Sequence, residues 1–324
     1  MTAIKSQNRL FSIVIPTWNN LAFLKLCIQS IQRNSYYNHQ IIVHVNDGSD
    51  GTLEWIKKAG IDYTHSEQNI GVCFAMNMMR TKVKTDYILF LNDDMYVLPF
   101  WDKVLYDEIE KLSDNYFFLS ATSIQPHTQS ASTILANYGD SIETFQEDKL
   151  LKEYMNYKIN DWMGATIPPN IVHRDIWDLV GGYSIEYSPG MYSDPDFTAK
   201  LYMCGVRFMK GLQASRIYHF ETKSTTRIRK NCGQMQFLLK WGMTSSTFRK
   251  VFTYKGKDFK SQKIGTFKTG NRFKISLIRG RLKAIFYLLT KDFGPYGNFG
   301  KKHLSNISLK EQNYKIELEL SCEE

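Results

Sequence analysis

Two adjacent carboxylates, Asp93 and Asp94, follow Asn92 at the end of the apolar run at residues 87–91. That run is typical of a buried strand in a mostly parallel sheet, and open α/β sheets bind ligands at the carboxyl ends of their strands. Two close carboxylates raise each other's pKa unless a cation compensates them, and hard divalent cations prefer oxygen ligands. The segment therefore predicts a metal site that holds a diphosphate. The alternative is a solvated turn before a helix that begins near Trp101.

Residues that suit a nucleotide follow the first predicted strand. Pro16, Thr17, Trp18 and Asn19 lie between a strand at residues 11–15 and the next helix. Backbone amides at a helix N-terminus, together with an aromatic ring, suit a nucleobase and its phosphates. Ordinary loop and capping chemistry is the alternative interpretation.

Further polar residues lie at similar places in the following segments. Asp47 ends the second strand, where a carboxylate can accept a hydrogen bond from a base or a ribose. Gly71, close after Asn69, would let the backbone approach a ligand. Asn77 is expected to face the same crevice from the following helix, although each of these residues also fits a turn or a structural role.

Two acids and a histidine in the second half could do chemistry. Asp194 could be a general base, with Asp196 as a second carboxylate that orients it. Both also suit the positive end of a helix dipole. His219 ends a strand, and a neutral His is a good further ligand for a divalent metal. Basic side chains that could bind a diphosphate follow it: Lys223, Arg227 and Arg229.

The elements that position these residues alternate between strands and helices, which predicts a parallel α/β sheet. The polar segment at residues 123–161 is expected to be a long loop over a site. We expect strands at residues 11–15, 41–45, 61–64, 87–91, 116–121 and 216–219, and helices at 21–31, 53–59, 104–112, 174–180 and 194–204, with one more after residue 69.

Composition and charge narrow the class of protein. The chain has 324 residues, of which 43% are hydrophobic, so it can bury a substantial core. Its five cysteines have no zinc-site spacing, which indicates reduced thiols in a cytosolic protein. We find no signal-peptide core and no apolar run long enough to span a membrane.

The net charge of +9 is unevenly distributed. Residues 231–302 contain sixteen Lys or Arg and two acids, so the rest of the chain sums to −5. We divide the chain into residues 1–229 and a basic, mainly helical region at 230–324, which includes an amphipathic stretch at 277–289. Such a region favours an acidic partner, which could be an anionic lipid, nucleic acid or a phosphate-bearing substrate. The alternative is a solvated basic face.

The order of these segments is more specific than any one of them. A strand with Pro-Thr-aromatic-Asn precedes a strand with Asn-Asp-Gly-Ser, then Asn-x-Gly, a strand with Asn-Asp-Asp, Gly-Gly-Tyr, Ser-Asp-x-Asp and a His. In this order, residues 10–227 resemble the GT-A glycosyltransferases, specifically the large inverting family 2. The resemblance implies a GT-A fold, a Rossmann-like α/β fold with a mostly parallel sheet flanked by helices. Here a basic helical C-terminal extension follows it.

The resemblance also implies roles for residues. Asp94 matches the last position of the family's Asp-x-Asp motif and would bind the metal, with His219 on the metal or the diphosphate. Asp194 would be the catalytic base. Ser193 stands where the family commonly has Glu, which leaves Asp196 as the other candidate. The nucleotide-sugar site would comprise Pro16, Thr17, Trp18, Asn19, Asp47, Asn69, Gly71, Asn77, Asn92 and Asp93.

The resemblance thus implies a transferase that moves a sugar from a nucleotide-diphosphate sugar, with a UDP-sugar expected, to a hydroxyl of a glycan or lipid-linked acceptor. The anomeric configuration would invert, and Mn²⁺ or Mg²⁺ would be needed. The protein would be cytoplasmic, with its basic region on the inner face of a membrane. Residues expected to shape the acceptor site are the 123–161 segment, Trp162, Gly164, the region around Trp177, and Tyr192.

Two other functions compete with this one. A sugar-phosphate nucleotidyltransferase can share the sheet and the metal-carboxylate chemistry, but it usually carries a Gly-rich, basic signature near its N-terminus that is absent here. A non-catalytic protein that binds nucleic acid or an anionic surface would use the basic region and would not need Asp94. Nucleic acid is not the partner that we expect.

Overall fold

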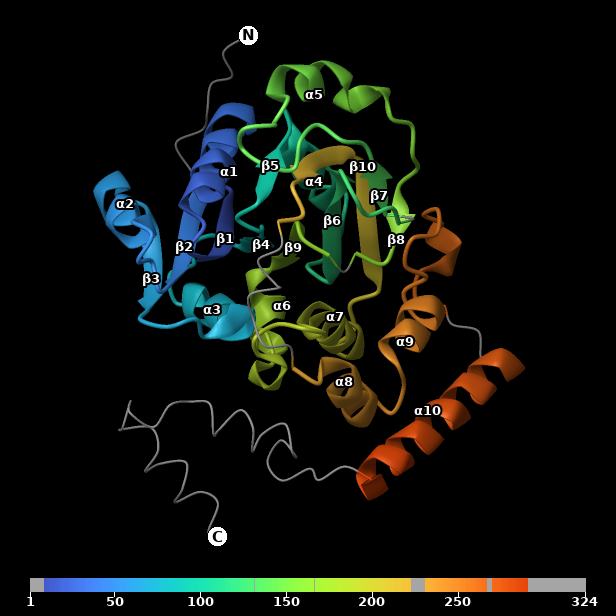
Figure 1. Ribbon diagram of the computed structural model, residues 1–324. Helices are drawn as coiled ribbons and strands as arrows, with labels where there is room; N and C mark the ends of the chain where they lie inside the picture. The colour runs from blue at the N-terminus through green and yellow to red at the C-terminus, as the bar shows by residue number, and fades with distance from the viewer. Residues whose placement is uncertain (1–8, 131, 166, 223–230, 267–269, 291–324) are drawn as a thin grey trace, which may run out of the picture.

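The computed structural model describes residues 9–290 except 131, 166, 223–230 and 267–269 (Figure 1). One ten-stranded sheet has the strand order β3-β2-β1-β4-β9-β6-β10-β5, with β7 paired to β6 and β8 paired to β10. The strands are β1 (Phe11–Trp18), β2 (Gln40–Asn46), β3 (Asp62–Ser66), β4 (Tyr87–Phe90), β5 (Met95–Val97), β6 (Phe117–Gln125), β7 (Thr133–Leu135), β8 (Trp162–Met163), β9 (Asn170–His173) and β10 (Phe208–His219).

Helices cover both faces of this sheet (Figure 1). They are α1 (Leu21–Asn34), α2 (Thr52–Ala59), α3 (Gly71–Arg80), α4 (Trp101–Ile109), α5 (Glu147–Glu153), α6 (Arg174–Leu179), α7 (Ser193–Met203), α8 (Gly233–Trp241), α9 (Ser245–Val251) and α10 (Asn271–Thr290), with short 3₁₀ turns η1 (Tyr154–Asn156), η2 (Ile185–Tyr187) and η4 (Ser261–Lys263).

Alternation along the strands divides the core into two layers. Ile13 and Ile15 of β1 pack with α1, α2 and α4, whereas Val14 between them packs with α3, α6 and α7. Successive side chains of a strand point to opposite faces, so a strand buried on both sides is mostly apolar. The prediction of an α/β sheet is therefore confirmed, and its first strands are parallel as expected.

The sheet is mixed beyond β4. β9 runs antiparallel to both β4 and β6, and β5 runs antiparallel to β10. The predicted end of the first strand was also wrong, because β1 continues past Pro16 to Trp18. Pairing with β4 ends at Val14, so only β2 flanks the strand at Pro16, where a residue without an N–H is tolerated.

The segment at residues 123–161 is not the long loop that we expected. It contains the end of β6, β7 and α5, and it buries its own apolar cluster against β5 and β10. Tyr138 and Leu150 of this segment are fully buried with Tyr218 of β10. Although its surface residues are polar, this segment is a folded cap that packs on one edge of the sheet.

The C-terminal helices continue the core of the preceding residues. Phe237 of α8 and Phe248 of α9 pack in one cluster with Phe197 of α7. Residues 223–230 lie outside the described part of the chain, so the division at residue 229 stays a prediction. No helix among the described residues is both long enough and apolar enough to cross a membrane.

Candidate active site

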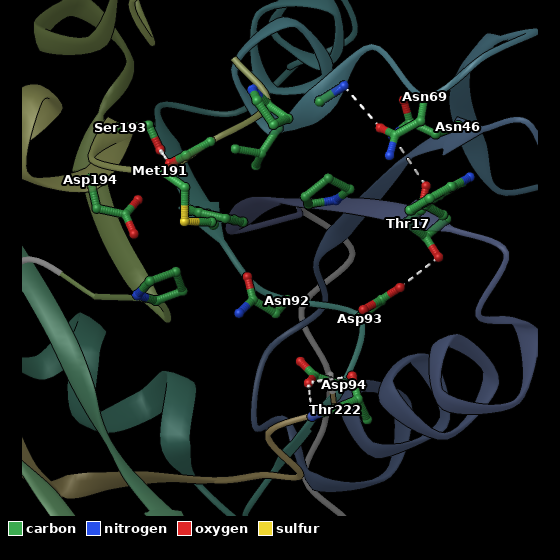
Figure 2. A pocket seen from close by; sticks show the side chains of 18 of the residues that line it. Thr17, Asn46, Asn69, Asn92, Asp93, Asp94, Met191, Ser193, Asp194 and Thr222 are labelled. Atoms are coloured by element: carbon green, nitrogen blue, oxygen red, sulfur yellow. Dashed lines mark hydrogen bonds between the residues drawn. The ribbon is translucent and has the colours of Figure 1, made fainter. Parts of the chain in front are cut away.

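A cavity of about 470 Å³ lies at the carboxyl ends of the central strands (Figure 2). Its walls come from the ends of β1, β2, β4 and β10 and from the loop before α7. The volume is that of a site for a small molecule or cofactor. It is lined by Pro16, Thr17, Trp18, Asn46, Asn69, Gly71, Val72, Phe90, Asn92, Asp93, Asp94, Pro168, Pro189, Gly190, Met191, Ser193, Asp194, His219, Glu221 and Thr222.

Many residues singled out from the sequence meet in this cavity, although they come from distant parts of the chain. The topology explains this, because parallel strands bring their carboxyl ends to one edge of the sheet. The predicted site residues among its lining are Pro16, Thr17, Trp18, Asn69, Gly71, Asn92, Asp93, Asp94, Asp194 and His219.

Asp94 is held by residues at the end of β10. One carboxylate oxygen accepts hydrogen bonds from the Thr222 backbone N–H (2.9 Å) and hydroxyl (2.8 Å), and the other lies 3.3 Å from His219 Nε2. Burial raises the pKa of Asp94, but His219 and Thr222 outweigh burial and hold that pKa below its ordinary value. The pKa of His219 is raised in turn, because Asp94 outweighs the effect of burial.

Asp93 points to a different partner. Its carboxylate accepts a hydrogen bond from the Thr17 hydroxyl at 2.6 Å, which joins the end of β4 to β1 (Figure 2). Asn46 at the end of β2 joins β1 to the loop before α3. Its side-chain NH₂ donates to the Thr17 carbonyl, and its side-chain oxygen accepts from the Ile70 N–H. Asp93 therefore points toward β1, whereas Asp94 points toward the end of β10.

Asp94 and His219 offer donor atoms of the kinds that suit a divalent cation. Asp94 offers carboxylate oxygen and His219 offers imidazole nitrogen, 3.3 Å apart on the cavity wall. In the described part of the chain, no cluster of three or more His, Cys, Asp or Glu could hold a metal alone. One or two side-chain ligands, completed by water and phosphate oxygens, is the usual arrangement for Mg²⁺, and a carboxylate with an imidazole also suits Mn²⁺.

Asp194 lies in the first turn of α7, on another wall of the cavity (Figure 2). Its carboxylate accepts a hydrogen bond from the buried Tyr183 hydroxyl at 3.1 Å. Burial raises the pKa of Asp194 to about 6, while the Tyr183 hydrogen bond and the charge of Lys255 act in the opposite direction. A carboxylate with such a pKa is ionised at neutral pH and is a stronger base than an ordinary Asp.

Gly71 allows two segments of the cavity wall to touch. It has φ +79°, and a Cβ there would lie 2.5 Å from Pro189 Cα and 2.5 Å from Ser188 Oγ. The Val72 N–H then donates to the Pro189 carbonyl at 2.9 Å. The predicted close approach at Gly71 is therefore to the loop before α7, which was not foreseen as part of the site.

We expect Gly71→Ala to destabilise the protein by about 1–3 kcal/mol more than Gly60→Ala. Both glycines have positive φ, but nothing lies within 4 Å of a Cβ at Gly60. The two variants share the backbone strain, so their difference reports the contact with Pro189 and Ser188. Urea unfolding of both variants measures it, and equal midpoints would contradict a tight contact at Gly71.

Glu221 and Thr222, which follow His219 closely in the chain, were not predicted as site residues. Thr222 donates twice to Asp94, as described above. Glu221 lines the cavity with φ +54°, and its carboxylate accepts from the backbone N–H groups of His127 (2.8 Å) and Thr128 (3.0 Å). Neither residue belongs to a periodic pattern, so only their position directly after His219 could have drawn attention to them.

Asn19 and Asp47 form a pair outside the cavity lining. The Asn19 amide donates to the Asp47 carboxylate at 2.8 Å, and its oxygen accepts from the Gly48 N–H at 2.9 Å. The Asn19 hydrogen bond is the main reason that the pKa of Asp47 is lowered. The pair directly follows the ends of β1 and β2, next to Trp18.

Two further predicted residues lie away from the cavity. Asn77 makes two hydrogen bonds to the backbone of Tyr183, at 2.8 and 2.9 Å, so it fixes that loop and does not face the crevice as we expected. Asp196 is fully buried, pairs with Lys240 and accepts a hydrogen bond from the indole N–H of Trp241, both in α8. Its position joins α7 to α8 and does not favour the expected role of orienting Asp194.

The residues expected at the acceptor site are also absent from the cavity lining. Trp162 is 1% exposed because it packs against Gly211, where a Cβ would lie 1.8 Å from its ring. Gly164 contacts Lys255, and Tyr192 caps α7 with φ +71°. Trp177 is a core residue beside Tyr183. The predicted basic residues Lys223, Arg227 and Arg229 lie outside the described part of the chain.

The α/β sheet and its acidic cavity fit the class of glycosyltransferases that the motif order indicates. Residues 12–167 match the model described as glycosyl transferase family 2. This match to residues 12–167 confirms the resemblance that was inferred from the motifs.

Two named glycosyltransferases are similar in sequence to parts of this chain, and one solved structure has a similar fold. The glycosyltransferase GlyG of Streptococcus pneumoniae serotype 4 is 26% identical over 176 residues, which are 48% of this chain and 52% of GlyG. GlyA of the same organism is 27% identical over 103 residues, 30% of this chain and 15% of GlyA. The crystal structure of S. aureus TarS 1–349 in complex with UDP has a TM-score of 0.48 at 14% identity, and covers 64% of this chain and 60% of that one. The chain thus matches about half of GlyG and a smaller share of GlyA.

Proposed function

We propose that this protein transfers a sugar from a nucleotide-diphosphate sugar to a hydroxyl of a glycan or lipid-linked acceptor, with inversion and with a divalent metal. A UDP-sugar is the proposed donor. One observation carries the proposal: a single cavity holds both the Asp94–His219 pair and the carboxylate of Asp194, whose pKa is about 6.

The donor nucleotide is assigned to the ends of β1 and β2. Trp18 offers an aromatic face, and Asp47 beside it offers a carboxylate that Asn19 already orients. Thr17 and Asn69 offer further polar groups to the same cavity. An aromatic face for the base and a carboxylate for base or ribose groups would fix the nucleoside, while the diphosphate would extend toward Asp94.

The charge of the cavity supports the need for a cation. Asp93, Asp94, Asp194 and Glu221 line it, and its described lining includes no Lys or Arg. A diphosphate would therefore meet like charges, which cost several kcal/mol unless they are compensated. Asp94 and His219 would hold a divalent cation, which when bound would neutralise the diphosphate and stabilise it as a leaving group.

Asp194 is the proposed general base. A base must lie within hydrogen-bond reach of the proton that it removes, so the acceptor hydroxyl is assigned to the wall formed by Gly190, Met191 and Asp194. Tyr183 holds one carboxylate oxygen of Asp194 and leaves the other for the hydroxyl. Attack from this side, with the diphosphate held at Asp94, would invert the anomeric carbon.

The pH dependence of activity should report Asp194. The base works when ionised, so kcat/KM should rise with pH through a midpoint near 6. The Tyr183 hydroxyl lowers the pKa of Asp194, so Tyr183→Phe should raise that pKa and move the rising limb to higher pH. Tyr96→Phe, which removes a hydroxyl bonded to Glu147 away from the cavity, is the control. If kcat/KM rises with the same midpoint pH in wild type, Tyr183→Phe and Tyr96→Phe, this result would argue against Asp194 as the base.

The activity itself is testable before the acceptor is known. Water can replace the acceptor hydroxyl as a slow nucleophile, so the release of nucleoside diphosphate from UDP-, GDP- and dTDP-sugars should be measured with Mn²⁺, with Mg²⁺ and with EDTA. We expect release from one nucleotide class only, and only with metal. Release that is unaffected by EDTA would exclude the metal-dependent mechanism. The cytoplasmic location stays a prediction.

A further inference from the structure

α10 carries an apolar stripe on its exposed side. Sixteen large apolar side chains in the described residues are clearly exposed, and seven of them lie on this one helix. At about 100° per residue, six of the seven fall within an arc of about 100°. The stripe comprises Ile275, Ile278, Leu282, Ile285, Phe286 and Leu289, which are 48% to 81% exposed.

The opposite side of α10 attaches the helix to the rest of the protein. The Ser276 hydroxyl hydrogen-bonds with the Thr247 hydroxyl of α9 at 2.6 Å. Gly280 is buried, and a Cβ there would lie 3.4 Å from Leu238 of α8. Figure 1 shows α10 at the periphery of the molecule, beyond α8 and α9. The stripe therefore faces away from the core.

Basic residues flank the stripe on both sides. Helical spacing places Arg272, Arg279 and Lys283 along one border and Lys274 and Arg281 along the other. All five are exposed, and residues 271–290 include no Asp or Glu. An apolar stripe between two rows of cations is the pattern of helices that lie in a membrane interface.

Charge also indicates whether the stripe binds a membrane or a second copy of the chain. The stripe residues Ile275, Ile278, Leu282, Ile285 and Leu289 have the alternating three- and four-residue spacing of a coiled coil. The positions beside such a seam would be Lys274, Arg279, Arg281, Phe286 and Leu288, so three of the five are cations. Two copies would then place cations against cations, whereas anionic lipid would match both the charge and the apolar surface.

We propose that α10 docks the protein on an anionic membrane surface. The stripe would enter the boundary between headgroups and acyl chains, and the five cations would lie at the level of the lipid phosphates. α8, which contacts α10, follows Asn231, whose amide donates to the Met191 carbonyl at the cavity wall. This docking would bring the cavity wall that includes Met191 close to a lipid-linked glycan, an inference that rests on the proposed function.

Vesicle sedimentation of the full chain tests the docking directly. Wild type should sediment with phosphatidylcholine vesicles that contain phosphatidylglycerol, and much less with phosphatidylcholine alone or at high salt. Leu282→Glu should weaken this binding at least tenfold, and so should Arg279→Glu combined with Arg281→Glu. Met203→Glu on α7 is the matched control, because Met203 is 69% exposed and Leu282 is 61% exposed.

Two results would overturn the proposal. One is vesicle binding by Leu282→Glu that equals that of wild type. The other is a wild-type dimer in light scattering that Leu282→Glu converts to a monomer, with no vesicle binding by either, since the stripe would then be an interface between copies. The thermal shift with nucleotide and Mn²⁺, measured on the same samples, separates either result from failure of the donor site.

Discussion

Asp194→Asn is expected to lower kcat by about 10²–10⁴-fold, the usual contribution of a general base, while donor binding is retained. Asn keeps the shape of the side chain and can still accept the Tyr183 hydrogen bond, but it cannot take a proton. Single-turnover kinetics with a saturating donor measures the chemical step, and calorimetry with the nucleotide measures binding. Wild-type kcat in this variant would exclude Asp194 as the base.

Stability distinguishes loss of the base from misfolding. The folded-state pKa of Asp194 is raised to about 6, from an ordinary value of 3.8. Its ionised form therefore opposes folding, and its effect on stability becomes less favourable as the pH rises from about 4 to about 6. Asn removes this penalty, so the Tm of Asp194→Asn at neutral pH should equal or exceed that of wild type. A large drop in Tm would make the kinetic result uninterpretable.

Asp94→Asn is expected to weaken metal-dependent nucleotide binding at least about 100-fold, because even residues behind a metal ligand contribute 10–100-fold. Turnover should nearly vanish. Asn can still accept the two hydrogen bonds from Thr222, so the fold should persist, but it offers no negative charge to the cation or to His219. Calorimetry with nucleotide and Mn²⁺ gives the affinities.

Asp178→Asn is the control for Asp94→Asn. Asp178 pairs with Arg80 at the surface, and its side chain is 48% exposed, away from the cavity. Nucleotide affinity in this variant should match that of wild type. Equal affinity of Asp94→Asn and wild type in the presence of Mn²⁺ would show that Asp94 is not a metal ligand.

The residues at strand ends were predictable from the sequence because one rule positions all of them. Asp93 and Asp94 follow one strand and His219 ends another, and these strands meet at one edge of the sheet. β5 and β9 were missed because strands of three and four residues show little periodicity. Without β9, the change from parallel to mixed pairing could not be foreseen.

Residues whose direction depends on packing were predicted less well. Asp196 follows Asp194 by two positions on a helix, which turns its side chain by about 200°, and it points to Lys240 instead of the cavity. Trp162 lies in the core because Gly211 leaves room for its ring, and that contact joins residues almost fifty positions apart. Motif spacing does not carry such long-range information.

The most direct test of a metal-dependent nucleotide site is a thermal-shift measurement of the wild-type chain with UDP, GDP and dTDP, each with Mn²⁺ and with EDTA. A ligand at about 100 times its Kd stabilises a protein by about 2.7 kcal/mol, which corresponds to about 5–10 °C at about 2–4 °C per kcal/mol. We predict such a shift for one nucleotide with Mn²⁺ and its loss with EDTA. The absence of any shift, or one unchanged by EDTA, would contradict the assignment of the cavity.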